Sequence, residues 1–149
     1  MIINVKRAAQ ADSALVAHLI HKLLQELAGM QLDPAPYAQT AQKLMAERII
    51  HALIAYDADT PVGVIDLNKC TAIYAGGRFA EITELYVAPD YRSAGVAPKL
   101  IAAAEEFARE KGWLRFEVGA PDQPAWKRTF DFYIKEEFEE VGPRLRKVF

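Results

Sequence analysis

The stretch from Glu81 to Leu100, EITELYVAPDYRSAGVAPKL, constrains the fold of this chain more than any other. An alternating apolar run over residues 82–87 predicts a strand, which ends at Pro89 and Asp90. A loop of small residues follows, and then an amphipathic pattern predicts a long helix with Pro98 in its first turn, where a missing backbone N–H breaks no intrahelical hydrogen bond. A strand, a tight loop and a helix N-terminus together present free backbone N–H groups and a partial positive charge to an anion.

The loop over residues 92–97 is therefore predicted to bind phosphate, because Gly95 and the small side chains around it let a phosphate reach the backbone. From these residues alone, the phosphate could belong to a nucleotide, a dinucleotide or coenzyme A. No Gly-Lys-Ser/Thr follows the loop, which excludes the phosphate loop of nucleoside-triphosphate enzymes. No G-x-G-x-x-G is present either, which disfavours a dinucleotide-binding fold.

Length and composition narrow the class of protein. We expect a single domain over residues 1–149, which is long enough for a sizeable core. The net charge of −2 gives no support for nucleic-acid binding. Cys70 is the only cysteine, and His18 and His21 have no evident third partner, so no disulfide and no metal site are expected. No apolar run is long enough for a membrane span and no signal peptide is recognisable, so we expect a cytoplasmic protein.

Apolar patterns predict the remaining elements. Beside the helix over 96–111, helices are expected from Asp12 to Gly29, over 37–48 and over 125–134; strands are expected over 2–6, 49–56, 62–67, 80–87 and 113–118, with a closing hairpin of 138–141 and 145–149. The strand, loop, helix and strand between residues 80 and 118 form a crossover with parallel strands.

Simple alternation along the central strand predicts which side chains share a face. Glu81, Thr83, Leu85 and Val87 are expected on one face, and Ala80, Ile82, Glu84 and Tyr86 on the other. Glu84 is therefore expected to point away from Glu81 and to be a structural residue or a salt-bridge partner.

The loop Arg92–Ala97 reads Arg-x-x-Gly-x-Ala and, with the strand before it and the helix after it, closely resembles motif A of the GNAT-type N-acetyltransferases. In that family the loop wraps the pyrophosphate of acetyl-coenzyme A. The order of predicted elements is also similar to the GNAT fold, so the resemblance covers nearly the whole chain. It implies an α/β (α+β) fold, with a mixed central sheet of about six to seven strands flanked by about four helices.

The resemblance also implies which residues bind acetyl-coenzyme A, the expected cosubstrate. The backbone of Leu85 and Val87 is expected to bind the pantetheine arm as an added strand would, with the Val87 N–H polarising the thioester carbonyl. The full set of expected cofactor contacts is Leu85, Tyr86, Val87, Arg92, Ser93, Ala94, Gly95, Val96 and Ala97.

Two catalytic residues are implied in the same way. Glu81 matches a position where some family members carry a catalytic acid–base residue, so it is expected either to accept the proton of the amine or only to bind the amine. Tyr133 is the expected general acid, because Phe132-Tyr133 matches the family's Phe-Tyr near the end of the last helix; the alternative is an aromatic side chain of the core. Two positions depart from the family, with Glu137 in place of a glycine and Trp126 in place of an asparagine.

The leading hypothesis is an acetyl-coenzyme-A-dependent N-acetyltransferase that acts on a primary amine of a small molecule, peptide or protein by direct attack, without an acyl-enzyme. The alternative is an acyl-coenzyme A binding or sensor module with little catalysis. A third hypothesis is another phosphate-binding protein that shares only the loop. The slightly acidic balance suits a cationic amine, and whether the chain forms a homodimer is left open.

Overall fold

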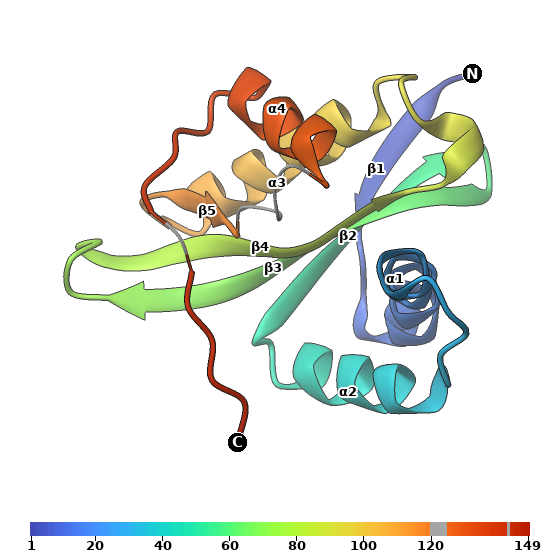
Figure 1. The fold of residues 1–149 in the computed structure, drawn as a ribbon, viewed down its shortest axis with the longest axis horizontal. Helices are drawn as coiled ribbons and strands as arrows, with labels where there is room; N and C mark the ends of the chain where they lie inside the picture. Colours follow the sequence, from blue (N-terminus) through green and yellow to red (C-terminus); the bar gives the residue numbers. More distant parts are fainter. Residues whose placement is uncertain (120–124, 143) are drawn as a thin grey trace.

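A computed structural model describes residues 1–119, 125–142 and 144–149. These residues form a five-stranded sheet in the order β1-β2-β3-β4-β5, with α1 and α2 on one face and α3 and α4 on the other (Figure 1). All neighbouring strands are antiparallel except β4 and β5, which are parallel. The strands are β1 (Ile3–Arg7), β2 (Ile50–Asp57), β3 (Thr60–Ala72), β4 (Gly77–Val87) and β5 (Phe116–Val118), and the helices are α1 (Ser13–Ala28), α2 (Ala35–Ala46), α3 (Val96–Glu110) and α4 (Lys127–Lys135).

The order of these elements confirms the predicted fold class and the parallel β4–α3–β5 crossover. The boundaries of most elements fall within a few residues of the prediction, although β3 continues further, to Ala72. Asp12 precedes α1 as expected, but its carboxylate accepts a hydrogen bond from the Ala9 N–H at 2.7 Å. It therefore caps the short 3-10 turn Gln10–Asp12 rather than α1 itself.

The sheet has fewer strands than predicted, because the expected closing hairpin does not form in the described residues. Residues 138–142 and 144–149 contain no strand, and Pro143 lies outside the described residues. The apolar side chains of this segment do not follow the period of two that buries one face of a strand. Phe138 packs against the core, whereas the others stay in solvent, as the large exposed fractions of Val141, Leu145, Val148 and Phe149 show.

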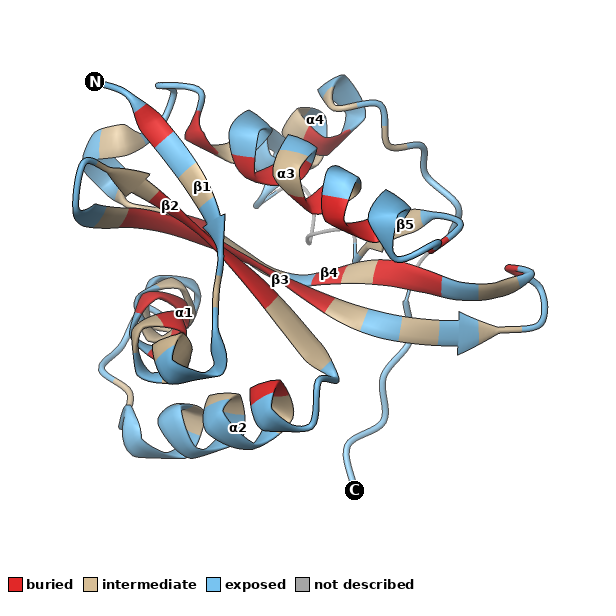
Figure 2. Cartoon of the chain, turned by 180° about the vertical axis from the view of Figure 1, so that it is seen from behind, coloured by how far each residue is buried: buried red, intermediate tan, exposed pale blue. Residues whose placement is uncertain are grey.

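Two apolar clusters lie on the two faces of the sheet, and the middle strands are buried on both sides (Figure 2). The larger cluster joins the sheet to α3 and α4, and includes Leu100 and Tyr133. The smaller cluster joins it to α1 and α2, and includes Val16 and Tyr86. Strand β4 is part of both clusters, so its side chains on one face contact α3 while those on the other face look toward α1.

Strand β4 contains one extra residue relative to β3, and this β-bulge changes which side chains share a face. Asp66 pairs with Glu84 and Leu67 pairs with Ile82, so Thr83 has no partner on β3. An extra residue shifts the alternation of every residue beyond it. The predicted faces are therefore wrong: Ala80, Ile82, Leu85 and Val87 lie on the α3 face, while Glu81, Glu84 and Tyr86 share the opposite face.

Candidate functional site

The loop before α3 has the open backbone that a phosphate needs. Gly95 precedes the helix with φ +83°, a conformation that favours glycine, and a Cβ atom at this position would have no heavy atom within 4 Å. Ser93 also has a positive φ, of +64°. The N-cap residue of α3, Gly95, has no side chain that could cap the helix, so the first N–H groups of α3 keep the capacity to bind an anion.

Arg92 joins this loop to two other parts of the molecule. Its Nε donates a hydrogen bond to the Val87 carbonyl at 3.0 Å, and its guanidinium forms an ion pair of 2.7 Å with Glu26 of α1. The hydrogen bond from Arg92 is the largest influence on the Glu26 carboxyl and lowers its pKa. Arg92 therefore holds the loop against both the end of β4 and α1.

Arg128, at the start of α4, reaches the same loop and was not predicted from the sequence. Its Nη2 donates a hydrogen bond to Ser93 Oγ at 3.0 Å. The neighbouring Lys127 instead pairs with Asp131 on its own helix at 2.6 Å. No ion pair of Arg128 is found within the described residues, so its charge is available to a phosphate at the loop. Ser93 and Arg128 are 35 residues apart, and no local sequence signal connects them.

The end of β4 provides a strand edge beside the loop. Pairing with β5 covers only Ala80 to Ile82, and beyond this point the described residues place no strand on that edge of β4. The backbone of Leu85 and Val87 can therefore accept an extended ligand in the manner of an added strand. The side chain of Tyr86 is only 5% exposed and packs toward α1, so any contact from Tyr86 to such a ligand has to use its backbone.

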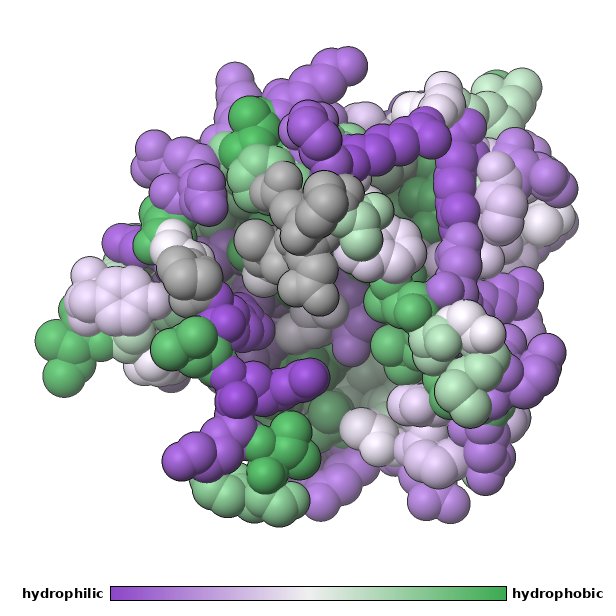
Figure 3. All heavy atoms as spheres, in the orientation of Figure 1, coloured by the Kyte–Doolittle hydropathy of each residue, from purple (hydrophilic) through white to green (hydrophobic). Residues whose placement is uncertain are grey.

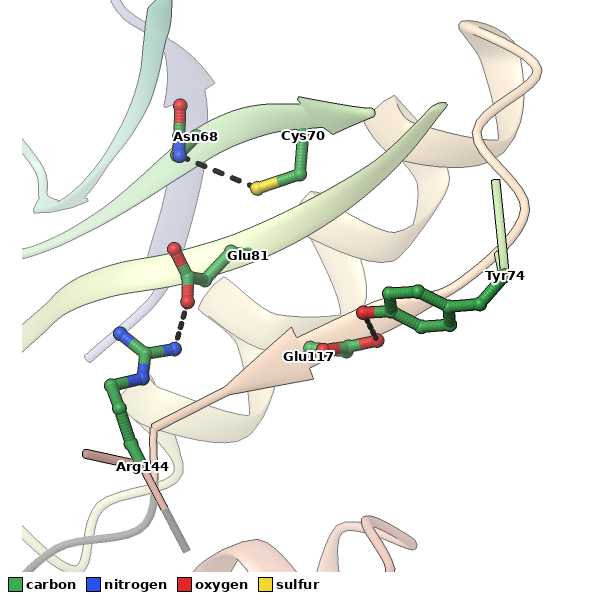
Figure 4. Close-up of polar contacts among 6 residues, drawn as sticks. All are labelled: Asn68, Cys70, Tyr74, Glu81, Glu117 and Arg144. Carbon is green, nitrogen blue, oxygen red and sulfur yellow. Dashed lines mark hydrogen bonds and ion pairs between the residues drawn. The ribbon is translucent and has the colours of Figure 1, made fainter. Parts of the chain in front are cut away.

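Figure 4 shows Glu81 of β4 near Asn68 and Cys70 of β3. The strand pairing puts Glu81 and Asn68 on the face of the sheet that looks toward α1 and α2. The Glu81 carboxylate forms an ion pair with Arg144 of the C-terminal segment. Cys70 Sγ accepts a hydrogen bond from Asn68 Nδ2 at 3.3 Å. Burial, and then the nearby Glu81 charge, raise the pKa of the Cys70 thiol, which disfavours a nucleophilic role for it.

Tyr133 lies on the other side of the sheet from Glu81. Its ring packs between Phe132 and Phe138, with centroid separations of 5.4 and 5.5 Å, and burial raises the pKa of its hydroxyl to about 12. It also lines a cavity of about 630 Å³ between α3, β5, α4 and residues 136–142. Tyr133 is therefore a neutral phenol at ordinary pH. A general acid has to carry its proton and a core residue has to be uncharged, so the neutral form is compatible with both roles.

The two departures from the family pattern have different consequences. Glu137 has φ +72°, so it adopts the left-handed conformation in which the family carries glycine. Because residue 137 is a glutamate and not a glycine, its backbone conformation is strained, and the chain adopts that conformation nevertheless. Trp126 precedes α4 and is 40% exposed, so it does not contribute to the core as a buried aromatic residue.

His21, one of the two histidines of α1, contacts the backbone of the chain. His21 Nε2 lies 2.7 Å from the Leu32 carbonyl oxygen and ties α1 to the loop that follows it. Over residues 1–119, 125–142 and 144–149, no group of three or more His, Cys, Asp or Glu side chains could hold a metal ion. In the same ranges, every helix is too short or too polar to cross a membrane.

The fold and this loop define an α/β protein built around a parallel crossover, with an open loop before the N-terminus of the crossover helix. Residues 17–130, most of the chain, match the model of the acetyltransferase (GNAT) family. The chain therefore belongs to the GNAT acetyltransferase family.

Named proteins that are similar to this chain are also acetyltransferases. The thialysine N-epsilon-acetyltransferase of Caenorhabditis elegans is 27% identical over 109 residues, covering 71% of this chain and 68% of that protein. The aminoalkylphosphonate N-acetyltransferase of Salmonella typhimurium is 25% identical over 146 residues, covering 98% of this chain and 91% of that protein. Among solved structures, an aminoglycoside acetyltransferase from an uncultured soil metagenomic sample has the same fold, with a TM-score of 0.83, 23% identity and coverage of 99% of this chain and 96% of that one.

Proposed function

We propose that this chain transfers an acetyl group from acetyl-coenzyme A to a primary amine of a small molecule or peptide, by direct attack while both are bound. The observation that carries the proposal is the uncapped N-terminus of α3, with the open loop at Gly95, beside the free edge of β4. Membership of the GNAT family supports it, and both named relatives are N-acetyltransferases.

The loop and the strand edge would divide the binding of acetyl-coenzyme A between them. The backbone N–H groups of residues 93–97 and the side chains of Arg92 and Arg128 would bind the phosphates. The backbone of Leu85 and Val87 would pair with the pantetheine arm, and the Val87 N–H would face the thioester carbonyl. Bound acetyl-coenzyme A supplies the activated acetyl group.

Glu81 and Tyr133 would handle the protons from opposite faces of the sheet, on the two sides of the free edge of β4. Glu81 lies six residues before Val87 on β4, roughly 20 Å along the strand, so it would take a proton from the ammonium group of the acceptor through a chain of water molecules. The neutral amine then forms a bond to the thioester carbonyl carbon. The carbon–sulfur bond breaks, and the departing thiolate receives the Tyr133 hydroxyl proton. A tyrosine with a pKa of about 12 is fully protonated before this step, as a general acid has to be.

A second candidate function is an acyl-coenzyme A binding module with little catalysis. The contact that favours it is the ion pair between Glu81 and Arg144, because this pair occupies the carboxylate that the reaction needs. The same loop and strand edge would bind the cofactor in either case, so cofactor binding alone does not separate the two functions.

Two measurements test the proposal. Acetyl-coenzyme A at a hundredfold excess over its Kd is expected to stabilise the protein by about 2.7 kcal/mol in thermal unfolding. Release of the coenzyme A thiol is then followed across a panel of amines for the wild type, Glu81→Gln and Tyr133→Phe, with kcat expected to fall about a hundredfold in each variant.

The outcomes separate the hypotheses. No thermal shift with any acyl-coenzyme A contradicts both candidate functions. A shift without thiol release on any amine selects the binding module. Full activity of both variants refutes the two catalytic assignments and leaves the transferase itself standing.

A further inference from the structure

A hollow beside the end of β4 has no role in the function proposed above. It has a volume of about 580 Å³ and lies between the last turns of α1, the loop that follows α1, and the end of β4. Its lining includes Lys22, Glu26, Met30, Tyr86 and Pro89. Figure 3 shows hydrophilic side chains gathered on the right of the view, between the loop before α3 and α1. The hollow therefore adjoins the strand edge proposed to bind the cofactor.

The walls of this hollow are held in place by the protein itself. Both backbone groups of Leu32, in the loop after α1, contact that helix. The Leu32 N–H donates to Gln25 Oε1 at 3.0 Å, and its carbonyl oxygen lies 2.7 Å from His21 Nε2. On the opposite wall, the ring of Tyr86 is buried in the smaller core cluster. A ligand that enters the hollow therefore meets walls that are already ordered, which favours binding.

The backbone of β4 shows how close the hollow lies to the proposed thioester site. The Ala88 N–H donates to the Val62 carbonyl at 2.8 Å, so Ala88 faces β3. Neighbouring residues of an antiparallel strand face opposite edges, so the N–H and carbonyl of Val87 face the free edge. Arg92 Nε donates to that Val87 carbonyl, and the Arg92 guanidinium pairs with Glu26. A single guanidinium group therefore separates the Glu26 carboxylate from the strand position proposed for the thioester.

Glu26 carries the negative charge of this hollow. Among the described residues that line it, Glu26 is the only acidic one. Burial, and then the nearby Glu26 charge, raise the pKa of the Tyr86 hydroxyl, so Tyr86 adds no charge at ordinary pH. A carboxylate at the wall of a hollow is the group that a primary ammonium binds by charge-assisted hydrogen bonds. In this structure, however, Arg92 occupies that carboxylate.

Arg92 is expected to leave Glu26 when a phosphate binds at the loop. Both side chains of the pair are partly exposed, so the pair is weak and can be exchanged. A guanidinium binds phosphate with two parallel hydrogen bonds, which makes the coenzyme a strong competitor for Arg92. Lys22 forms no ion pair within the described residues and lies four residues before Glu26. A lysine that precedes a glutamate by four residues is the weaker orientation for a helical pair, so Lys22 replaces Arg92 poorly.

We propose that Glu26 binds the ammonium group of the acceptor, and that Arg92 blocks Glu26 until the coenzyme phosphates draw Arg92 to the loop. This inference rests on the proposed transferase activity and adds to it an acceptor-binding residue and an order of binding, with acetyl-coenzyme A first. The acceptor amine would lie beside Val87, and its proton would leave through water to Glu81. Because the coupling is reciprocal, the acceptor also strengthens binding of the coenzyme by the same factor.

Titration of butylamine, a simple primary amine, tests the proposal with and without saturating coenzyme A. The wild type is expected to bind butylamine about fivefold more tightly with coenzyme A, a modest gain because the pair that has to open is weak. Arg92→Gln is expected to bind butylamine without coenzyme A as tightly as the wild-type complex does, because Glu26 is uncovered. Glu26→Gln is expected to bind butylamine more weakly, and equally with and without coenzyme A.

Glu110→Gln is the matched control. Glu110 forms another exposed ion pair of 2.7 Å, with Arg7 at a different place on the surface, and this variant is expected to keep the wild-type gain. Equal affinity for butylamine in the two wild-type titrations, or no binding in either, overturns the proposal. A wild-type gain that persists in Glu26→Gln also overturns it, because the coupling would then act through another group.

The inference and the proposed function fail in different ways. The titrations use coenzyme A without an acetyl group, so they do not depend on turnover. Coupled binding that requires Glu26, in a protein that releases no thiol with any amine, supports the Glu26 site and contradicts the transferase. Thiol release with independent binding of the two ligands overturns the inference and leaves the transferase intact.

Discussion

Arg92, in the loop before α3, forms an ion pair of 2.7 Å with Glu26, which lies in the last turn of α1. Because Arg92 also donates to the Val87 carbonyl, one side chain connects the proposed phosphate loop, the strand that carries Glu81, and the helix on the other face of the sheet. A phosphate at the loop would have to share Arg92 with the Glu26 carboxylate. The proposed cofactor site is therefore coupled to the position of α1.

Replacing Glu26 tests this competition. Glu26→Gln removes a negative charge close to the proposed phosphates, so the Kd for acetyl-coenzyme A is expected to fall roughly two- to fivefold. Isothermal titration at low and high salt measures the effect, which should shrink as salt screens it. A Kd that instead rises would mean that Glu26 orients Arg92 for binding.

The same pair predicts a small pH dependence of stability. Arg92 lowers the pKa of Glu26 in the folded state, so the contribution of the pair is present above the unfolded value of about 4.5 and is lost as pH falls through the folded pKa. Both side chains are 42% exposed, so this contribution is expected to be at most about 1 kcal/mol. Urea unfolding of the wild type and Glu26→Gln at neutral and acidic pH should differ by that amount at neutral pH and converge in acid.

Arg128 is predicted to bind a phosphate of the coenzyme. Arg128→Gln is expected to raise KM for acetyl-coenzyme A about tenfold, which corresponds to about 1.4 kcal/mol, with little change in kcat, because the side chain lies at the loop and away from the thioester. Lys127→Gln is the matched control, because it removes the same charge one residue away. Lys127 pairs with Asp131 on its own helix and does not contact the loop. An equal effect of the two substitutions would point to general electrostatic attraction instead of a specific contact.

Sequence patterns were sufficient for the elements whose signals are local. The small residues of the loop, Pro98 and the apolar stripe of α3 predicted a helix over 96–111, and the structure has it at Val96–Glu110. The parallel crossover followed from the strands on either side. Such signals work because helix caps, turn residues and apolar periodicity act within a few residues of one another.

The features that were predicted wrongly or not predicted at all depend on residues that are far apart in the sequence. The bulge at Thr83 arises from pairing with β3. Alternation along β4 alone therefore predicted Glu84 on the face opposite Glu81, whereas the two residues share a face. The contact between Arg128 and Ser93 requires α4 to lie beside the loop. The closing hairpin was predicted from an apolar segment around Gly142 that does not pair in the described residues. No local pattern contains these relationships.

Gly63 of β3 is predicted to be intolerant of any side chain. A Cβ atom there would lie 2.9 Å from the Tyr86 carbonyl oxygen and 3.2 Å from Leu100 Cδ1, so β4 or α3 would have to move. Gly63→Ala is expected to lower the free energy of unfolding by about 1–3 kcal/mol. Gly119→Ala is the control in urea unfolding, because the three nearest heavy atoms to an added Cβ there belong to the flexible Arg144 side chain, at 3.6 Å or more. Equal stability of the two variants would contradict the close packing of β3 against β4 and α3.

Arg144 is predicted to compete with the acceptor for Glu81. Its side chain is 64% exposed while that of Glu81 is only 17% exposed, so the arginine can leave for solvent at a low cost and the carboxylate cannot. Arg144→Gln is expected to lower KM for a cationic acceptor severalfold with kcat unchanged, because a bound amine would no longer have to displace the guanidinium. Arg146→Gln, two residues further along the same exposed segment, is the control for the change in net charge. If Arg144→Gln raises KM instead, Arg144 holds Glu81 in its working orientation, and the ion pair belongs to the active state of the enzyme.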